Sequence, residues 1–499
     1  MALGIGELNV LHDRSPKGLG PKSSNWQITL NLNDIAKHPP DPWVQYDVPA
    51  GKRNQLLSSP TLNPSLFDLH MNKRHAVSTL GALGLMAFSP GLFAQSSATP
   101  KGLQKAKVVV VGAGYGGLSA AKYLRALSNQ TLDVTLVEMQ SKFVSSPLSN
   151  LVLSGYAKLE DITLSYEGVA KRFGITFQKD RALRVDTARR LLYLQNGSPL
   201  PYDKLILSPG VSFDFDAVEG LSEAHDSGHC LQAWSNNEEL ALLRQQLLEL
   251  PDGGIFALTI PESPYKCPPA PYERACQVAS YFKAHKPKSQ VWILDANDNV
   301  VSNAQPFKRF WSEHYADQIQ YHPNHKLIGV QNSGKVLSFE VQDDLEVSLS
   351  NVLPPMRAGM VAKASGLVNV NDKWCGVHFL DFQSEQAQDV HILGDAIQAA
   401  SLMPKSAHMA HAQALVVASA IVNELSDKPK NQRATLDNIC FSFLDDRQAI
   451  HIASKHHYDA SEKTFLLDDN SANNSQTPSA SEGEAAWKWA HEMWRDMLS

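Results

Sequence analysis

The chain has 499 residues, of which 43% are hydrophobic and 19% charged, and its formal net charge is −6. This composition supplies enough apolar material for about three packed domains of roughly 150 residues each. The acidic balance argues against a nucleic-acid binder, which needs a basic surplus to neutralise phosphates. Five cysteines exclude a disulfide-rich scaffold but leave room for one functional pair. No apolar run reaches the roughly 18–20 residues of a membrane-spanning helix, so we expect no transmembrane anchor.

The N-terminal region differs from the rest of the chain. Residues 1–70 are rich in proline and show no sustained hydrophobic period, so we expect a wrongly assigned or disordered extension. From Met71, two basic residues precede a largely apolar run over 76–88, and small residues suited to cleavage follow. This is the layout of an export signal, and we assign signal and spacer to 71–98. We therefore expect translation to start at Met71 and the mature protein to be periplasmic.

Short apolar runs after this region predict parallel strands that alternate with helices. The expected strands are 107–111, 134–137, 204–207, 255–260, 291–294 and 390–393. The resulting fold class is α/β, with two Rossmann-like three-layer nucleotide-binding domains and a C-terminal α+β interface domain. The first domain is discontinuous, over 105–215 and 335–425. The second covers 216–334, and the interface domain covers 426–499.

The end of the chain predicts a loop and then a helix. Residues 468–484 are rich in Ser, Asn and Asp, which is typical of a flexible loop. Over 487–498, apolar residues recur at helical spacing. This segment has no basic face, so a place in the core or at an interface fits it better than membrane anchoring.

A glycine motif follows the first strand. Gly112, Gly114 and Gly117 lie between strand 107–111 and a helical segment, and Glu138 ends the next strand. In this context the glycines permit a tight turn, close approach of backbone to a pyrophosphate and close helix packing. An acid at the position of Glu138 can hold ribose hydroxyls. The pattern therefore predicts a dinucleotide site.

A second motif indicates that the dinucleotide is FAD. Gly394 and Asp395 end an apolar strand, where two-dinucleotide flavoproteins use an Asp to bind the ribityl chain. A helix is expected from about 406 to about 425, and its positive end with Lys405 would stabilise an anionic reduced flavin. The strand and turn that end at Gly210 fit the return of the chain to the FAD domain.

The second nucleotide-binding domain lacks the glycines that NAD(P)H binding would need. Its corresponding loop is rich in proline and contains Cys267, followed by an expected helix start near 271 and by Glu273. The helix N-terminus and Lys266 should both favour a Cys267 thiolate, and Glu273 could carry protons. A purely structural cysteine in a proline-rich turn fits the same pattern. The other cysteines show no metal spacing, and we expect no metal site. His408 and His411, with no acidic residue near them in sequence, fit ordinary helix histidines better than ligands.

From residue 107 onward the chain resembles the flavoprotein subunit of flavocytochrome c sulfide dehydrogenase. The matching stretches are 108–117, 265–275, 283–288, 351–355 with 358–359, 374–375, 394–396 and 403–406. The most specific is Cys-Pro-Pro…Pro-Tyr-Glu-Arg, at 267–274. The resemblance implies a redox-active disulfide beside the flavin between Cys267 and Cys375. In that family FAD is often attached through a cysteine, whereas this chain has Ser146 at the matching place, so we expect dissociable FAD.

The resemblance also implies a reaction and partners. Hydrosulfide or a related reduced sulfur species would attack the disulfide and give a persulfide and a thiolate, and two electrons would pass to FAD. A separate c-type cytochrome subunit would accept them one at a time, because this sequence has no Cys-x-x-Cys-His haem site. Two alternatives stay open, a sulfide:quinone oxidoreductase and a non-catalytic flavoprotein redox scaffold.

Overall fold

The computed structural model of the chain describes residue 103 and residues 106–234 and 237–499. The predicted extension at 1–70 and the predicted signal and spacer at 71–98 lie outside these residues, so both stay predictions. In the ranges just given, no helix combines the length and the apolar character that crossing a membrane requires.

A seven-stranded sheet carries the first nucleotide-binding fold, in the order β19-β20-β21-β9-β1-β2-β5. Its central strand β1 (Lys107–Val111) pairs in parallel with β2 (Asp133–Glu138) and with β9 (Lys204–Leu207). All four valines of β1 are buried, as is typical of a strand covered on both faces. The other strands are β5 (Thr176–Lys179), β19 (Val377–His378), β20 (Gln383–Ser384) and β21 (Val390–Ile392).

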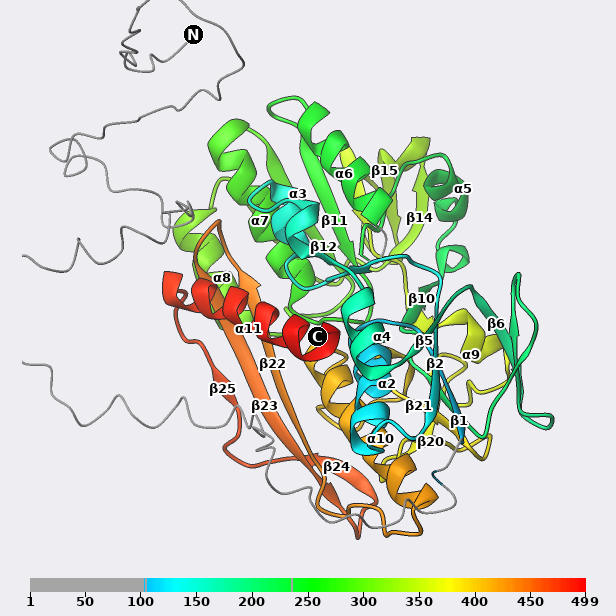
Figure 1. The fold of residues 1–499 in the computed structure, drawn as a ribbon. Coiled ribbons are helices and arrows are strands. Elements are labelled where there is room, and N and C mark those ends of the chain that lie inside the picture. The colour runs from blue at the N-terminus through cyan, green and yellow to red at the C-terminus, as the bar shows by residue number, and fades with distance from the viewer. Residues whose placement is uncertain (1–102, 104–105, 235–236) are drawn as a thin grey trace, which may run out of the picture. The chain divides into compact units, whose positions relative to one another are not determined.

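Two helices pack against each other beside this sheet, α2 (Tyr115–Leu127) and α10 (Ala407–Leu425) (Figure 1). A Cβ built on Gly116 of α2 would lie 3.4 Å from the Cβ of Ala410 in α10, so the two backbones approach closely there. The remaining elements of this region are β3 (Phe143–Val144), α3 (Ser149–Ser154), β4 (Thr163–Leu164), α4 (Glu167–Phe173), β6 (Ala182–Asp186), β7 (Leu191–Leu194), β8 (Leu200–Pro201), β10 (Val211–Phe213), β18 (Met356–Ala358) and α9 (Met360–Ala364).

A second, fully parallel sheet has the order β13-β12-β11-β17. Strand β11 (Ile255–Ile260) leads through the proline-rich loop to α7 (Ala270–His285). The other elements are α5 (Leu221–Asp226), α6 (Asn237–Glu249), β12 (Gln290–Asp295), α8 (Ala304–His314), β13 (Ile319–His322), β14 (Leu327–Gln331), β15 (Val336–Phe339), β16 (Leu345–Glu346) and β17 (Leu349–Val352). The expected α/β class is therefore confirmed.

The C-terminal part forms an antiparallel sheet crossed by a helix. Figure 1 shows α11 (Ala480–Leu498, red) lying over the long strands β22 (Thr435–Phe443) and β23 (Ala449–Asp459). Strands β24 (Thr464–Leu467) and β25 (Asn473–Asn474) pair with β23.

The expectation of a flexible loop over 468–484 is wrong for part of that range. Besides β25, its last residues belong to α11, which begins at Ala480. The Ser479 side chain accepts a hydrogen bond from the Glu482 amide and caps the helix. A serine followed three residues later by glutamate is a known helix-start signal, which the polar composition of the segment conceals. The apolar face expected over 487–498 is largely buried, as the spacing predicts.

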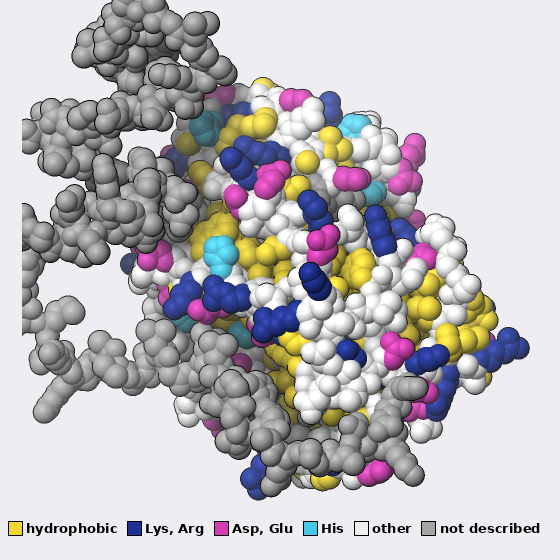
Figure 2. Space-filling model, in the orientation of Figure 1, with side chains coloured by type: hydrophobic (Ala, Val, Ile, Leu, Met, Phe, Trp, Pro, Cys, Tyr) yellow, Lys and Arg dark blue, Asp and Glu magenta, His cyan; other side chains and the backbone are white. Residues whose placement is uncertain are grey.

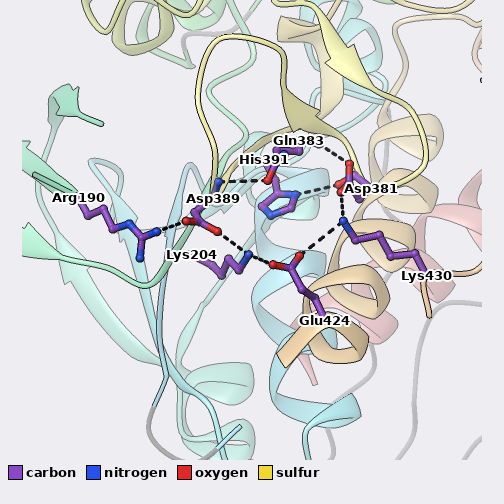
Figure 3. Close-up of polar contacts among 8 residues, drawn as sticks. All are labelled: Arg190, Lys204, Asp381, Gln383, Asp389, His391, Glu424 and Lys430. Carbon is purple, nitrogen blue, oxygen red and sulfur yellow. Dashed lines mark hydrogen bonds and ion pairs between the residues drawn. The ribbon is translucent and has the colours of Figure 1, made fainter. Parts of the chain in front are cut away.

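Buried charges hold the amino-terminal edge of the first sheet (Figure 3). Lys204, at the start of β9, pairs with Asp389 at 2.6 Å, and both side chains are under a tenth exposed. Lys204 also pairs with Glu424 near the end of α10, and Arg190 pairs with Asp389. Lys430 completes the group by pairing with Glu424 at 3.6 Å. The cofactor motifs all follow the carboxyl ends of strands, so this network braces the opposite edge of the sheet.

Candidate functional site: an FAD cleft flanked by two thiols

The glycine loop joins β1 to α2 and has the geometry of an anion-binding turn. Gly112 has φ +91°, and a Cβ on Gly117 would lie 1.9 Å from the Gly112 carbonyl oxygen, so close packing demands glycine there. A Cβ on Gly114 would meet no atom within 4 Å, so the loop is open at this point. No side chain caps the N-terminus of α2. This end of the helix can therefore bind a pyrophosphate through its N–H groups.

Glu138 lies against the glycine loop, where the sequence places it. Its Oε2 atom accepts a hydrogen bond from the Ala113 amide at 2.8 Å. Gly210 follows the neighbouring strand β9 with φ +64°, and its carbonyl oxygen accepts from the Gly359 amide at 3.0 Å. Both residues thus lie at the carboxyl ends of the two strands that flank β1, although the ribose contact of Glu138 stays a prediction.

Asp395 provides the test of whether the site fits FAD. It follows Gly394, whose φ is +78°, and its Oδ1 atom is buried with no hydrogen-bond partner in the structure. A buried, unpaired carboxylate oxygen is costly unless a ligand hydroxyl or similar donor satisfies it. The next helix, α10, begins after Ser406, close to the predicted start. Together with the open glycine loop, these residues fit a bound FAD.

Lys405 contacts the loop that contains Asp395. Its Nζ atom donates to the Asp395 carbonyl at 2.9 Å and lies 3.7 Å from the centre of the Trp374 ring. Burial lowers the pKa of Lys405 to about 8, while the charges of Asp395 and Cys375 oppose that shift. Lys405 is therefore a cation whose charge changes close to neutral pH.

Cys267 lies between β11 and α7 in a left-handed conformation, with φ +57°. Its amide donates to the Lys405 carbonyl at 2.8 Å, and its own carbonyl accepts from the Ala270 amide at 3.0 Å. The charge of Lys266 favours the Cys267 thiolate, as expected, but burial outweighs it. Burial raises the pKa of Cys267 well above its usual value, and the opposing charge of Lys266 is the smaller influence.

Cys375 is fully buried and contacts the same loop. Its amide donates to the Ala396 carbonyl at 3.0 Å, and its carbonyl accepts from the Gln398 amide at 2.8 Å. Burial raises the pKa of Cys375 to about 12, and the Lys405 charge opposes this. Cys267 and Cys375 thus both bind the backbone of the segment from Asp395 to Lys405. All five cysteines are free thiols in the structure, so the disulfide stays a prediction.

Glu273 is a buried carboxylate near this segment, on the first turn of α7. Its Oε1 atom accepts from the Phe443 amide and its Oε2 atom from Asn150 Nδ2, both at 2.8 Å. Burial raises the pKa of Glu273 to about 7. The negative charge of Glu273 also acts on Cys267. Glu273 can therefore exchange a proton near neutrality.

Ser146 is exposed beside the residue that precedes Cys267. Its hydroxyl oxygen accepts a hydrogen bond from Lys266 Nζ at 3.4 Å. The structure therefore places Ser146 next to the loop that contains Cys267.

Some contacts of the site were not predictable from motifs. Trp494 in α11 donates through Nε1 to the Tyr115 hydroxyl at 3.0 Å, and Tyr115 in turn contacts Ser145 Oγ at 2.6 Å. The C-terminal helix thereby supports the first residue of α2. His411 has no acidic residue near it in sequence, but the fold brings Asp496 of α11 to 3.6 Å from its Nε2 atom. Among the described residues, no group of His, Cys, Asp and Glu is arranged to hold a metal ion.

Comparison with known proteins decides the family. The models "Sulfide dehydrogenase [flavocytochrome c] flavoprotein chain, central" and "Flavocytochrome c sulphide dehydrogenase, flavin-binding" match residues 240–354 and 432–498. A sulfide dehydrogenase flavoprotein chain from Chlorobaculum thiosulfatiphilum is 56% identical over 46 residues, which cover 94% of that sequence and 9% of this chain. The chain belongs to the flavocytochrome c sulfide dehydrogenase flavoprotein family.

Other similarities of this family member extend over more of the chain. The model "Pyridine nucleotide-disulphide oxidoreductase" matches residues 106–247. The mitochondrial sulfide:quinone oxidoreductase of Dictyostelium discoideum is 25% identical over 336 residues, covering 66% of this chain and 73% of that protein. The mouse protein of the same name is 23% identical, and the match spans 65% of it. The solved sulfide:quinone oxidoreductase of Aquifex aeolicus has a TM-score of 0.64 at 19% identity, over 79% of this chain and 91% of that one, which shows a shared fold.

Proposed function

We propose that this flavoprotein oxidises sulfide, or a related reduced sulfur species, and passes the electrons to a separate c-type cytochrome subunit. The observation that carries the proposal is the position of Cys267 and Cys375, which bind the two ends of the segment that bears Asp395 and Lys405. A redox pair placed there adjoins the residues that would hold the flavin. FAD, when bound, would take up electrons in pairs and release them singly.

Four side chains take part in the proposed sulfur chemistry, two as reacting thiols, one as a stabilising charge and one as a proton acceptor. In the oxidised protein, hydrosulfide attacks Cys267 Sγ, and the bond to Cys375 Sγ breaks. The products are a Cys267 persulfide and a Cys375 thiolate, so no electron is lost or gained. Lys405 stabilises that thiolate, since its charge lowers the pKa of Cys375. Glu273, with a pKa of about 7, takes the proton when hydrogen sulfide is the attacking species.

The loop that follows β11 in the second sheet bears on the identity of the electron acceptor. The loop from β11 to α7 contains proline in place of the glycines that a nicotinamide dinucleotide needs. A haem partner that accepts single electrons therefore suits the flavin better than NAD(P)H. A quinone is the second candidate, because relatives of the family are sulfide:quinone oxidoreductases. We further propose that FAD is non-covalent, with Ser146 at the attachment position, and that the protein works in the periplasm.

Anaerobic reduction tests this function. The FAD-loaded protein is mixed with sulfide and then with cytochrome c, with a soluble quinone analogue, or with neither. We expect sulfide to bleach the flavin and cytochrome c to restore its colour. Cys267→Ser should abolish bleaching. The control Cys230→Ser, which removes a buried thiol that contacts Ser350 Oγ at 3.3 Å, should not abolish it. Bleaching that survives in Cys267→Ser would refute the disulfide mechanism, and restoration by the quinone alone would establish the second candidate.

A further inference from the structure

A third cysteine, Cys440, lies on strand β22, which forms hydrogen bonds with Ser406 and with Glu273. Asn438 and Cys440 are two residues apart on β22, so their side chains share a face of the strand. Asn438 Oδ1 accepts a hydrogen bond from Ser406 Oγ at 2.5 Å, and Cys440 Sγ contacts the same oxygen at 3.7 Å. At the end of β22, the Phe443 amide donates to Glu273 at 2.8 Å. Cys440 therefore lies between the start of α10 and the start of α7.

Cys267 is connected to Ser406 through the backbone of Lys405. Its amide binds the carbonyl of Lys405, and Ser406 is the next residue in the chain. Cys267, Ser406, Asn438 and Cys440 thus form a continuous group. Among neighbouring charges, that of Cys440 has the largest effect in raising the pKa of Cys267, larger than that of Glu273. The hydrogen bonds through Lys405, Ser406 and Asn438 thus place the two cysteines in one region of the structure, although they come from different domains of the chain.

We propose that Cys440 is a third thiol of the reaction centre, which takes the sulfane sulfur from a persulfide on Cys267. This inference rests on the proposed function, since it needs that persulfide. Cys440 Sγ attacks the outer sulfur, the bond between that sulfur and Cys267 Sγ breaks, and one proton passes from Cys440 to Cys267. The products are a Cys440 persulfide and a Cys267 thiol. The step is redox-neutral and needs no further reactant.

The surroundings of Cys440 suit this role. Burial raises the pKa of Cys440 to about 11, but Ser406 and Asn438 lower it, and the carboxylate of Glu273 acts on both thiols. Cys440 and Cys267 are both partly exposed, whereas Cys375 is fully buried. Transfer to Cys440 would leave Cys267 and Cys375 as a dithiol pair.

Persulfide mapping by mass spectrometry tests the transfer, because trypsin separates all five cysteines. The peptides are 205–244 with Cys230, 267–274 with Cys267, 275–283 with Cys276, 374–405 with Cys375 and 434–447 with Cys440. The FAD-loaded protein receives one equivalent of sulfide without oxygen, and iodoacetamide then blocks its thiols and persulfides before digestion without reductant.

We expect the extra sulfur mainly on peptide 434–447 in the wild-type protein and on peptide 267–274 in Cys440→Ser. Cys276→Ser, which removes a buried thiol bound to Trp311 Nε1 at 3.1 Å, should retain the wild-type distribution. Sulfur that stays on peptide 267–274 in the wild-type protein overturns the transfer but leaves the proposed function intact. Sulfur on no peptide, with the flavin unbleached, overturns both.

A measurement on the wild-type protein avoids dependence on the folding of a variant. Mild oxidation of the fully reduced protein with diamide should join peptides 267–274 and 434–447 in part of the molecules, alongside the link between 267–274 and 374–405. Absence of the first link, with the second present, would contradict the proximity of Cys440 and Cys267.

Discussion

Lys405 holds its ammonium nitrogen 3.7 Å from the centre of the Trp374 ring, and Cys375 follows Trp374 directly in the chain. Because burial lowers the pKa of Lys405 to about 8, the positive charge beside Cys375 is lost as the pH rises through that value. The charge that assists a thiolate on Cys375 is thus itself sensitive to pH.

The first prediction concerns this charge. In the wild-type protein, the rate at which sulfide bleaches the flavin should fall as the pH rises above about 8, because neutral Lys405 no longer stabilises the Cys375 thiolate. Lys405→Met should be about tenfold slower at neutral pH, the effect of roughly one pKa unit on Cys375, and should show no fall near pH 8. Stopped-flow absorbance measures both rates. The exposed control Lys363→Met should behave as the wild type, and a Lys405→Met profile that still falls near pH 8 would contradict the assignment.

The second prediction concerns Glu273 and stability. Its pKa is raised from 4.5 to about 7 in the folded protein, so the folded state keeps a proton that the unfolded chain releases between these values. The free energy of unfolding should therefore fall, through this group, as the pH rises across that window, by about 3 kcal/mol. Glu273→Gln does not titrate and should lack this dependence.

Urea unfolding at several pH values measures the difference. The exposed control Glu462→Gln should follow the wild-type curve. Parallel curves for wild type and Glu273→Gln between these pH values would show that the Glu273 carboxyl is not perturbed.

The third prediction concerns cofactor retention. Asp395→Ala removes the buried, unpaired carboxylate oxygen and should weaken FAD binding by about 10- to 100-fold, the worth of one hydrogen bond to a charged group. Titration of the apoprotein with FAD, followed by flavin fluorescence, gives the dissociation constants. Asp427→Ala, at an exposed position beyond α10, is the matched control. Equal affinities for both variants would remove Asp395 from the cofactor site.

The fourth prediction concerns the bond to the flavin. Acid precipitation of the wild-type protein should release all of the yellow chromophore, because a serine hydroxyl at position 146 is a poor nucleophile. Ser146→Cys places a thiol beside Lys266 and should leave part of the flavin in the pellet. Flavin in the wild-type pellet would show that attachment does not depend on a cysteine at this position.

The fifth prediction concerns the support from α11. Trp494→Phe leaves the buried Tyr115 hydroxyl without the indole donor and should lower the free energy of unfolding by about 1–2 kcal/mol. Trp487 stacks on His491 and is only partly buried, so Trp487→Phe should lower the free energy of unfolding by less. Equal losses in urea unfolding would mean that the hydrogen bond is not the reason for the change.

Much of the fold could be predicted because its strands are short apolar runs with turn residues at their ends. Strands β9 and β11 have the predicted bounds, and α10 begins after its capping serine. The raised pKa of Cys267 could not be predicted from the neighbouring Lys266, because it depends on how deeply the thiol is buried. Cys440 shares no motif or period with Cys267, and only the packing of the C-terminal sheet reveals their proximity.

The contact between Trp494 and Tyr115 joins the first helix of the cofactor domain to the last helix of the chain. A growing polypeptide makes the glycine loop early, but Trp494, the partner of Tyr115, follows 379 residues later in the chain. The loop thus reaches its full packing only after α11 has been made. Capture of the flavin is expected to follow the synthesis of α11, and a chain that lacks α11 should be colourless even when its earlier domains have folded.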